Sequence, residues 1–118
     1  MRILLADDQK QVRLALQALL KRQSGMKVVG EASEAQALMT QIVQTRPDLV
    51  LLDWGLPGLA DIGSVPVMRQ NQPGLSIIVL SGRPEVRGEA LAAGADAFVS
   101  KMEPPERLLA LLYSMNDS

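Results

Sequence analysis

Four apolar runs in this chain each end in residues that are suited to phosphoryl chemistry. The chain has Asp7 and Asp8 after Arg2–Ala6, Asp53 after Leu49–Leu52, Ser81 after Ile77–Leu80 and Lys101 after Ala97–Ser100. The carboxyl ends of parallel strands share one edge of an open sheet, and ligands bind at that edge. If the runs are parallel strands, we expect these side chains to converge although they are far apart in the sequence.

A carboxylate that attacks a phosphoryl group needs a divalent cation, because both partners are negatively charged. Asp7, Asp8 and Asp53 supply three carboxylates around one point, and Mg²⁺ takes oxygen ligands of this kind. All three are therefore candidate metal ligands. We assign Asp53 as the phosphoryl acceptor, because it stands alone after the expected central strand and precedes glycine-rich, permissive backbone.

The remaining residues of the set can hold the phosphoryl oxygens. Lys101 can pair with one oxygen as a point charge, and the Ser81 hydroxyl and the backbone amide of Gly82 can donate hydrogen bonds to the others. Each residue alone has an ordinary interpretation: a helix cap, a turn former or a surface charge. The chemical interpretation depends on their shared position at the ends of adjacent strands.

Length and composition exclude several classes of protein. The 118 residues fit one domain, spanning residues 1–118. The absence of cysteine excludes disulfides and thiolate sites, and the absence of histidine excludes histidine metal ligands and bases. A net charge of -1 gives no electrostatic footprint for nucleic acid or an anionic membrane. The N-terminus contains neither a signal peptide nor a spanning segment, so we expect the cytoplasm.

Hydrophobic periodicity predicts alternating strands and helices. The predicted strands are Ile3–Ala6, Val28–Val29, Leu49–Leu52, Ile77–Leu80 and Phe98–Val99. The predicted helices are Val12–Leu20, Ala35–Val43, Val65–Gln72, Pro84–Ala93 and Glu106–Tyr113, and Asp8 and Ser33 are their candidate N-caps. Such alternation indicates an α/β domain with a parallel sheet.

From Arg2 to about Tyr113 the chain resembles the receiver domain of two-component response regulators. The resemblance rests on Asp7-Asp8, Asp53, the Leu56-Pro57-Gly58 that follows it, Ser81, and Phe98-Val99-Ser100-Lys101. Segments such as ILLADDQ, VVGEAS, RPDLVLLD and LAAGADAFVSK are similar to the NarL/FixJ branch, whose members usually continue into a LuxR-type helix-turn-helix domain. The implied fold is flavodoxin-like, as in CheY: a doubly wound (βα)5 domain with a five-stranded parallel sheet in the order 2-1-3-4-5.

The resemblance also implies a mechanism. A sensor histidine kinase would phosphorylate Asp53 in the presence of Mg²⁺, and the carbonyl of Gly55 would be a further metal ligand. Ser81 would move toward the phosphoryl group while the aromatic ring of Phe98 rotates inward. The face formed by the fourth helix, fifth strand and fifth helix would report the change, and it is a candidate homodimer interface. DNA would be contacted only through a helix-turn-helix domain, which this chain lacks.

Some features depart from the family pattern or allow two interpretations. Gly63 and Pro66 interrupt the expected third helix, and the segment from Ser81 to Lys101 is about two residues shorter than usual. Phe98 is equally consistent with an ordinary core aromatic. Trp54 could contact a partner, lie at the lip of the site or simply be exposed.

Three alternatives to a receiver that controls transcription need weighing: a second kind of receiver, an enzyme and a flavin binder. The chain could be a stand-alone receiver that acts by docking on another protein or by relaying phosphate. A phosphatase of the haloacid dehalogenase type would use an aspartate nucleophile, but Gly55 stands where its second acid is needed. A flavodoxin-like flavin binder would need a hydroxyl-rich phosphate loop where Asp7-Asp8 stand. We therefore expect a signalling domain and not an enzyme.

Overall fold

The computed structural model, which describes residues 1–63, 65–70 and 72–116, contains one five-stranded sheet in the order β2-β1-β3-β4-β5. Every pair of neighbouring strands is parallel. The strands are β1 (Arg2–Ala6), β2 (Lys27–Ala32), β3 (Leu49–Asp53), β4 (Ser76–Ser81) and β5 (Ala97–Ser100). This is the predicted doubly wound α/β fold with the predicted strand order.

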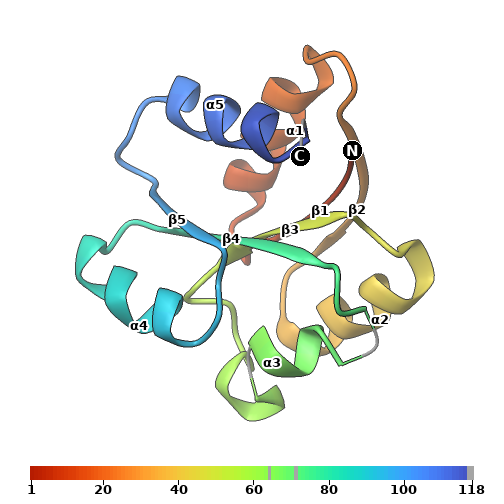
Figure 1. Cartoon of the computed structure of the whole chain (residues 1–118), viewed down its shortest axis with the longest axis vertical. Coiled ribbons are helices and arrows are strands. Elements are labelled where there is room, and N and C mark those ends of the chain that lie inside the picture. The colour runs from red at the N-terminus through yellow and green to blue at the C-terminus, as the bar shows by residue number, and fades with distance from the viewer. Residues whose placement is uncertain (64, 71, 117–118) are drawn as a thin grey trace.

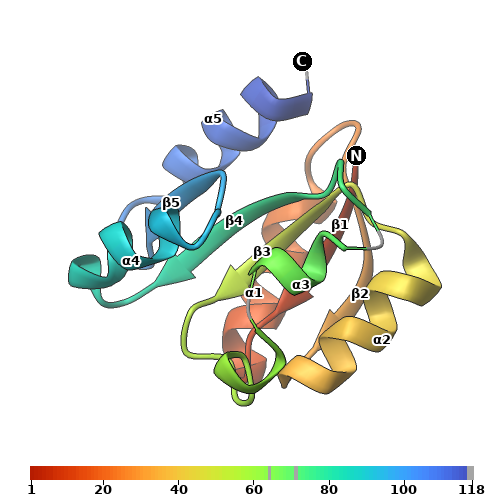
Figure 2. The same ribbon diagram turned by 60° about the horizontal axis from the view of Figure 1, so that its bottom comes forward.

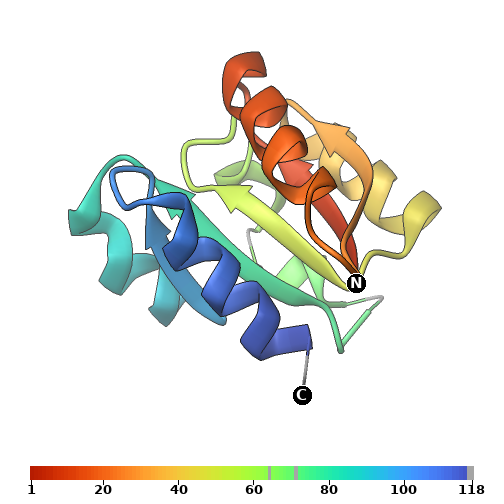
Figure 3. The same cartoon turned by 90° about the horizontal axis from the view of Figure 1, so that it is seen from above.

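Helices cover both faces of the sheet, as Figure 1 shows. The helices are α1 (Lys10–Lys21), α2 (Ala35–Thr45), α3 (Val65–Met68), α4 (Arg87–Ala92) and α5 (Pro105–Asn116). α1 and α5 lie on one face, which Figure 3 shows from above, and α2, α3 and α4 lie on the other, with α3 between its two neighbours (Figures 1 and 2). The central strands are therefore covered on both sides.

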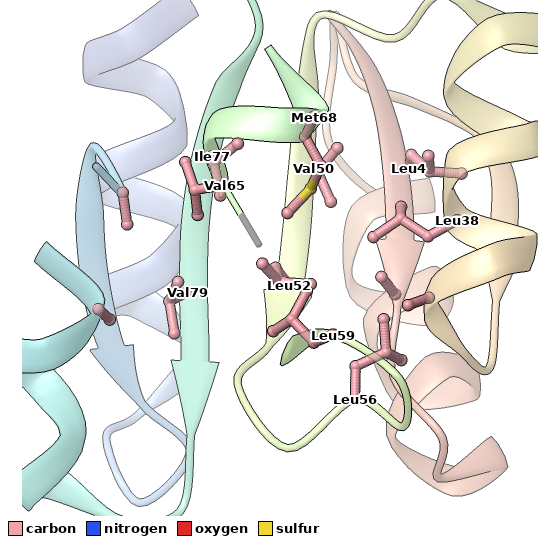
Figure 4. Close-up of a cluster of buried hydrophobic side chains, with 14 of the residues drawn as sticks. Leu4, Leu38, Val50, Leu52, Leu56, Leu59, Val65, Met68, Ile77 and Val79 are labelled. Atoms are coloured by element: carbon pink, nitrogen blue, oxygen red, sulfur yellow. The ribbon is translucent and has the colours of Figure 1, made fainter. Parts of the chain in front are cut away.

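Apolar side chains form one core cluster on each face of the sheet. Leu4, Val50, Leu52 and Val79 point into the cluster beneath α2, α3 and α4, where Figure 4 shows them with Leu38 and Met68. Ile3, Leu5 and Leu51 alternate with them and belong to the cluster beneath α1 and α5. All five residues of β3 are buried, which explains why this strand reads as an unbroken apolar run.

The register of the strands sets the functional edge of the sheet. Ala6 pairs with Leu52, Asp53 pairs with Leu80, and Ser81 pairs with Ser100. Asp7 and Lys101 are the next residues along β1 and β5. The polar residues after the apolar runs therefore lie along one edge, as parallel pairing requires.

Two predicted helix caps are wrong. The N-cap of α1 is Gln9 and has no side-chain cap, so Asp8 does not cap this helix. The N-cap of α2 is Glu34, not Ser33, and its carboxylate accepts hydrogen bonds from the backbone amides of Gln36 and Ala37. The longer glutamate side chain reaches the same free amides that a serine would satisfy.

The structure also corrects several predicted boundaries. α3 ends at Met68 instead of continuing to Gln72, and Asn71 of that prediction lies outside the described residues. The segment predicted as one helix from Pro84 begins with a 3-10 turn, Pro84–Val86, before the six-residue α4. β2, α1 and α5 are longer than predicted. A fixed proline φ and a flexible glycine near each start explain the irregular α3 and α4 regions.

Arg69 ties three segments together at the end of the sheet opposite the polar edge. Its guanidinium donates to the carbonyl of Leu75 at 3.1 Å and to the carbonyl of Gly94 at 2.5 Å. It also pairs with the carboxylate of Asp96 at 2.6 Å, which in turn accepts a hydrogen bond from the amide of Ile77 at 2.7 Å. One side chain thus fixes the entries to both β4 and β5.

We expect Arg69→Ala to lower the free energy of unfolding by about 1–3 kcal/mol, because it leaves two carbonyls and a carboxylate without their charged partner. Urea unfolding followed by circular dichroism measures this change. Arg107→Ala is the matched control, since its guanidinium lies 3.9 Å from Glu103 in an exposed pair, and we expect less than about 0.5 kcal/mol there. Equal losses in the two variants would contradict this role of Arg69.

Candidate functional site

Three carboxylates meet at the polar edge of the sheet. Asp7, Asp8 and Asp53 each offer an oxygen, and these oxygens all lie within 4.8 Å of one another. Asp7 is 2% exposed and Asp53 is 9% exposed, whereas Asp8 is open to solvent. The structure thus brings together the three acids that were singled out as candidate metal ligands, and it leaves one side of the group accessible.

Lys101 is the cation that contacts this group. Its Nζ lies 2.7 Å from Oδ2 of Asp7 and 3.5 Å from Oδ1 of Asp53. The backbone amide of Lys101 donates to the carbonyl of Ser81 at 2.8 Å, so the start of the β5–α5 loop is held beside the end of β4. This backbone contact holds Lys101 where its ammonium group reaches both buried carboxylates.

Hydrogen bonds hold both the carboxylate and the backbone of Asp7. Its Oδ1 accepts a hydrogen bond from the amide of Gln9 at 2.9 Å, and its carbonyl accepts one from Arg13 at 2.6 Å. Its own amide donates to the carbonyl of Ala32 at 3.0 Å. These contacts fix the position of the carboxylate before any ligand binds.

Asp53 lies in an environment that opposes its charge. Burial raises the pKa of its carboxyl above the ordinary value, and the nearby charge of Asp7 raises the pKa further. The amide of Gly55, which donates to Oδ1 at 3.2 Å, and the Lys101 ammonium act in the opposite direction without cancelling the effect. A cation added beside Asp53 would relieve this unfavourable charge.

Ser81 and Gly82 lie one strand further along the edge. Ser81 is 5% exposed, and its Oγ accepts a hydrogen bond from the amide of Arg83 at 3.0 Å. Among the described residues, none accepts a hydrogen bond from the hydroxyl hydrogen, so Ser81 keeps a donor for a ligand. Gly82 is exposed, and a Cβ at this position would meet no atom within 4 Å.

Phe98 and Trp54 occupy different settings. Phe98 is 6% exposed and belongs to the core cluster beneath α2, α3 and α4, so in this conformation its ring is a core aromatic. Trp54 is half-buried against the same cluster, and its backbone amide donates to the carbonyl of Leu80 at 3.2 Å. Its indole also lines a cavity together with Gly55, directly after Asp53.

Sequence reasoning missed the residues that support the site. Arg13 joins the carbonyl of Asp7 to the carboxylate of Glu31, with which it forms a 2.9 Å ion pair. The Gln9 amide supports Asp7 through a backbone contact that no side-chain pattern reveals. The signal available for Arg13 was a charged residue on the partly buried face of an amphipathic helix, which is also common in helices without such a role.

The donor set fits a hard divalent cation. Mg²⁺ prefers carboxylate and carbonyl oxygens and typically keeps several waters, which the solvent-open side beside Asp8 allows. No nitrogen or sulfur ligand from histidine or cysteine is available in the sequence. Together with a lysine and a serine hydroxyl, this edge has the groups to bind a phosphoryl ligand.

Comparison with known proteins places the chain in a family. Residues 3–113 match the model of the response regulator receiver domain. The chain belongs to the response regulator receiver domain family. The receiver domain is 36% identical over 111 residues to the transcriptional regulatory protein YhcZ of Bacillus subtilis, which covers 92% of this chain and 52% of YhcZ. It is 33% identical over 113 residues to the nitrate/nitrite response regulator protein NarL of Escherichia coli, which covers 94% of this chain and 52% of NarL.

A solved structure supports the same branch. The receiver domain superposes on a LuxR-family two-component response regulator from Aurantimonas with a TM-score of 0.83 and 28% identity, covering 97% of this chain and 83% of that one. The chain spans about half the length of the curated relatives that it matches. In the part that the structure describes, no helix is both long and apolar enough to cross a membrane.

We expect Asp53→Asn to stabilise the receiver domain at pH 7. A pKa that is higher in the folded state than in the unfolded chain means that charging Asp53 destabilises the fold at every pH above the ordinary value. Removing the charge should therefore add about 0.5–2 kcal/mol at pH 7, and the gain should shrink as the pH falls through the raised pKa of the folded state and vanish below the ordinary value of 3.8.

Thermal unfolding of wild type and Asp53→Asn across this pH range measures the effect. Glu106→Gln is the control, because it removes an exposed carboxylate of α5 outside the site, and we expect less than about 0.5 kcal/mol at any pH. A loss of stability in Asp53→Asn at pH 7, or an undiminished gain in acid, would contradict the described electrostatics.

Proposed function

We propose that this receiver domain accepts a phosphoryl group on Asp53 from a sensor histidine kinase, and that the modification switches a transcriptional output. The observation that carries the proposal is the cluster of three carboxylates within 4.8 Å of one another, with Lys101 in contact with two of them. This arrangement costs stability, because like charges are held together in a partly buried place. Such a cost suits a binding site better than a purely structural edge.

The reaction would proceed by direct displacement on phosphorus. An oxygen of the Asp53 carboxylate forms the new bond, the bond from phosphorus to the donor nitrogen breaks, and the donor keeps the electron pair. Lys101 is near enough to pair with an oxygen of the arriving group, since its Nζ already lies 3.5 Å from Asp53. The Ser81 hydroxyl and the Gly82 amide would donate to the remaining oxygens.

Asp7, Asp8 and Asp53, with the carbonyl of Gly55, would hold Mg²⁺. The ion supplies positive charge that offsets the repulsion between the carboxylate and the phosphoryl group. Asp7 is already oriented by Gln9 and Arg13, so it needs little reorganisation to bind a cation. Its 2.7 Å contact with Lys101 would weaken when a divalent ion shares its charge, which frees the ammonium for the phosphoryl oxygens.

The output would follow from Ser81. When its hydroxyl turns toward a phosphoryl oxygen, the 3.0 Å contact of Oγ with the Arg83 amide is lost or altered, and the segment before α4 must move. The signal would leave through the face formed by α4, β5 and α5, with Phe98 and Ser81 as switch residues and a homodimer as one readout. α4 has only six residues after a 3-10 turn, so we expect its docking geometry to differ from that of longer helices.

Two other functions receive less support. A stand-alone receiver would use the same site and differ only in its output. A transcriptional role is favoured because the relatives YhcZ and ExaE, which are about twice as long, are a transcriptional regulatory protein and a transcriptional activator protein. An aspartate-based phosphatase would need an acid at position 55, where glycine stands. We also propose that the domain acts in the cytoplasm, where a sensor kinase would present its phosphohistidine.

Incubation with acetyl phosphate and Mg²⁺, followed by intact-protein mass spectrometry, tests the proposal. We expect one phosphoryl adduct on wild type, strong dependence on Mg²⁺, and loss of the adduct in Asp53→Asn. Asp8→Ala should still be modified but should require more Mg²⁺, because it removes the solvent-exposed ligand and leaves the acceptor in place. An adduct of equal yield on Asp53→Asn would show that the acceptor assignment is wrong.

A further inference from the structure

A cavity of about 500 Å³ opens where the loop after β3 faces α4. It is lined by residues 54–56 and 58–61 of the loop and by Glu89 and Ala93 of the α4 region. Figures 1 and 2 both show this loop and α3 on the face of the sheet that also carries α4. The volume lies within the range of sites that hold small molecules or a few side chains. The proposed phosphorylation chemistry uses none of its side chains.

Part of the cavity wall is apolar. Leu56 and Leu59 belong to the buried core cluster, in which Figure 4 shows them, and both also line the cavity. Trp54 is half-buried beside them, so its indole supplies a flat aromatic surface. Among the described residues, none accepts a hydrogen bond from its indole N–H. An occupant with an apolar stem would therefore find a matching surface.

Two residues of the cavity wall, Asp61 and Glu89, carry negative charge without a positively charged partner among the described residues. Asp61 lies on the 3-10 turn Ala60–Ile62, and Glu89 lies on α4, so the two carboxylates come from different elements around one opening. Both are exposed, and within the described residues neither forms an ion pair or accepts a side-chain hydrogen bond. In the described part of the chain, no lysine or arginine lines the cavity. The charge complementarity thus calls for a cation.

We propose that this cavity is a docking site for an arginine side chain of a partner protein. Arginine combines an apolar stem with a planar guanidinium that stacks on indole and pairs with carboxylates. Lysine would offer a point charge but no planar surface for Trp54. The side chains of this cavity differ from those of the Asp7, Asp8 and Asp53 cluster, and the two sites adjoin at Gly55, whose backbone lines the cavity.

Fluorescence of Trp54, the single tryptophan of the chain, provides a direct readout. The probe is an acetylated Leu–Arg–Leu amide, and its matched control carries citrulline, which keeps the shape and loses the charge. Titrations are run in excess Mg²⁺ so that the three-carboxylate cluster does not compete for the peptide. We expect saturable binding of the arginine peptide and at least about fivefold weaker binding of the citrulline peptide.

Four single variants decide where the peptide binds. Asp61→Asn and Glu89→Gln should each weaken binding about two- to fivefold, the factor that corresponds to one exposed ion pair. Glu106→Gln removes an exposed carboxylate of α5 and should bind as wild type does. Equal binding of the two peptides, unchanged binding by both cavity variants, or no saturable change up to about 10 mM peptide would each overturn the proposal. Weakening by Asp8→Asn alone would assign the peptide to the carboxylate cluster and overturn it as well.

Discussion

The structure depends on holding three carboxylates together at one edge of the sheet with a single lysine between two of them. Lys101 contacts Asp7 at 2.7 Å and Asp53 at 3.5 Å, and the charge on Asp53 remains unfavourable in spite of this contact. Moving the acids apart would lower this cost but would also destroy a ready site for a cation and a phosphoryl group. The receiver domain therefore gives up stability where its chemistry is proposed to occur.

The rest of the fold keeps that edge rigid. β3 is buried along its whole length, and its register with β1 and β4 sets Asp53 beside the residues that follow those strands. Arg69 locks the entries to β4 and β5 at the opposite end. Rigid strands and adaptable loops at their carboxyl ends are the usual division between scaffold and function in such sheets.

The strands and their order could be predicted from the sequence because parallel strands covered on both faces appear as short apolar runs, such as Leu49–Leu52. The convergence of Asp7, Asp53 and Lys101 followed from that topology. Helix ends were less predictable, since Glu34 and Ser33 are adjacent candidates and local geometry decides which one reaches the free amides. The supporting contacts of Gln9 and Arg13 could not be predicted, because they depend on backbone positions and not on a pattern of side chains.

The central claim is that Asp53, and not one of its two neighbouring acids, receives the phosphoryl group. Reducing the acyl phosphate with borohydride converts the modified aspartate to homoserine, and peptide mass spectrometry then shows which residue carried the group. The electrostatic and topological position of Asp53 predicts homoserine at residue 53 alone. Homoserine at Asp7 or Asp8, or a phosphoryl group that resists reduction because it sits on Ser81, would contradict the account.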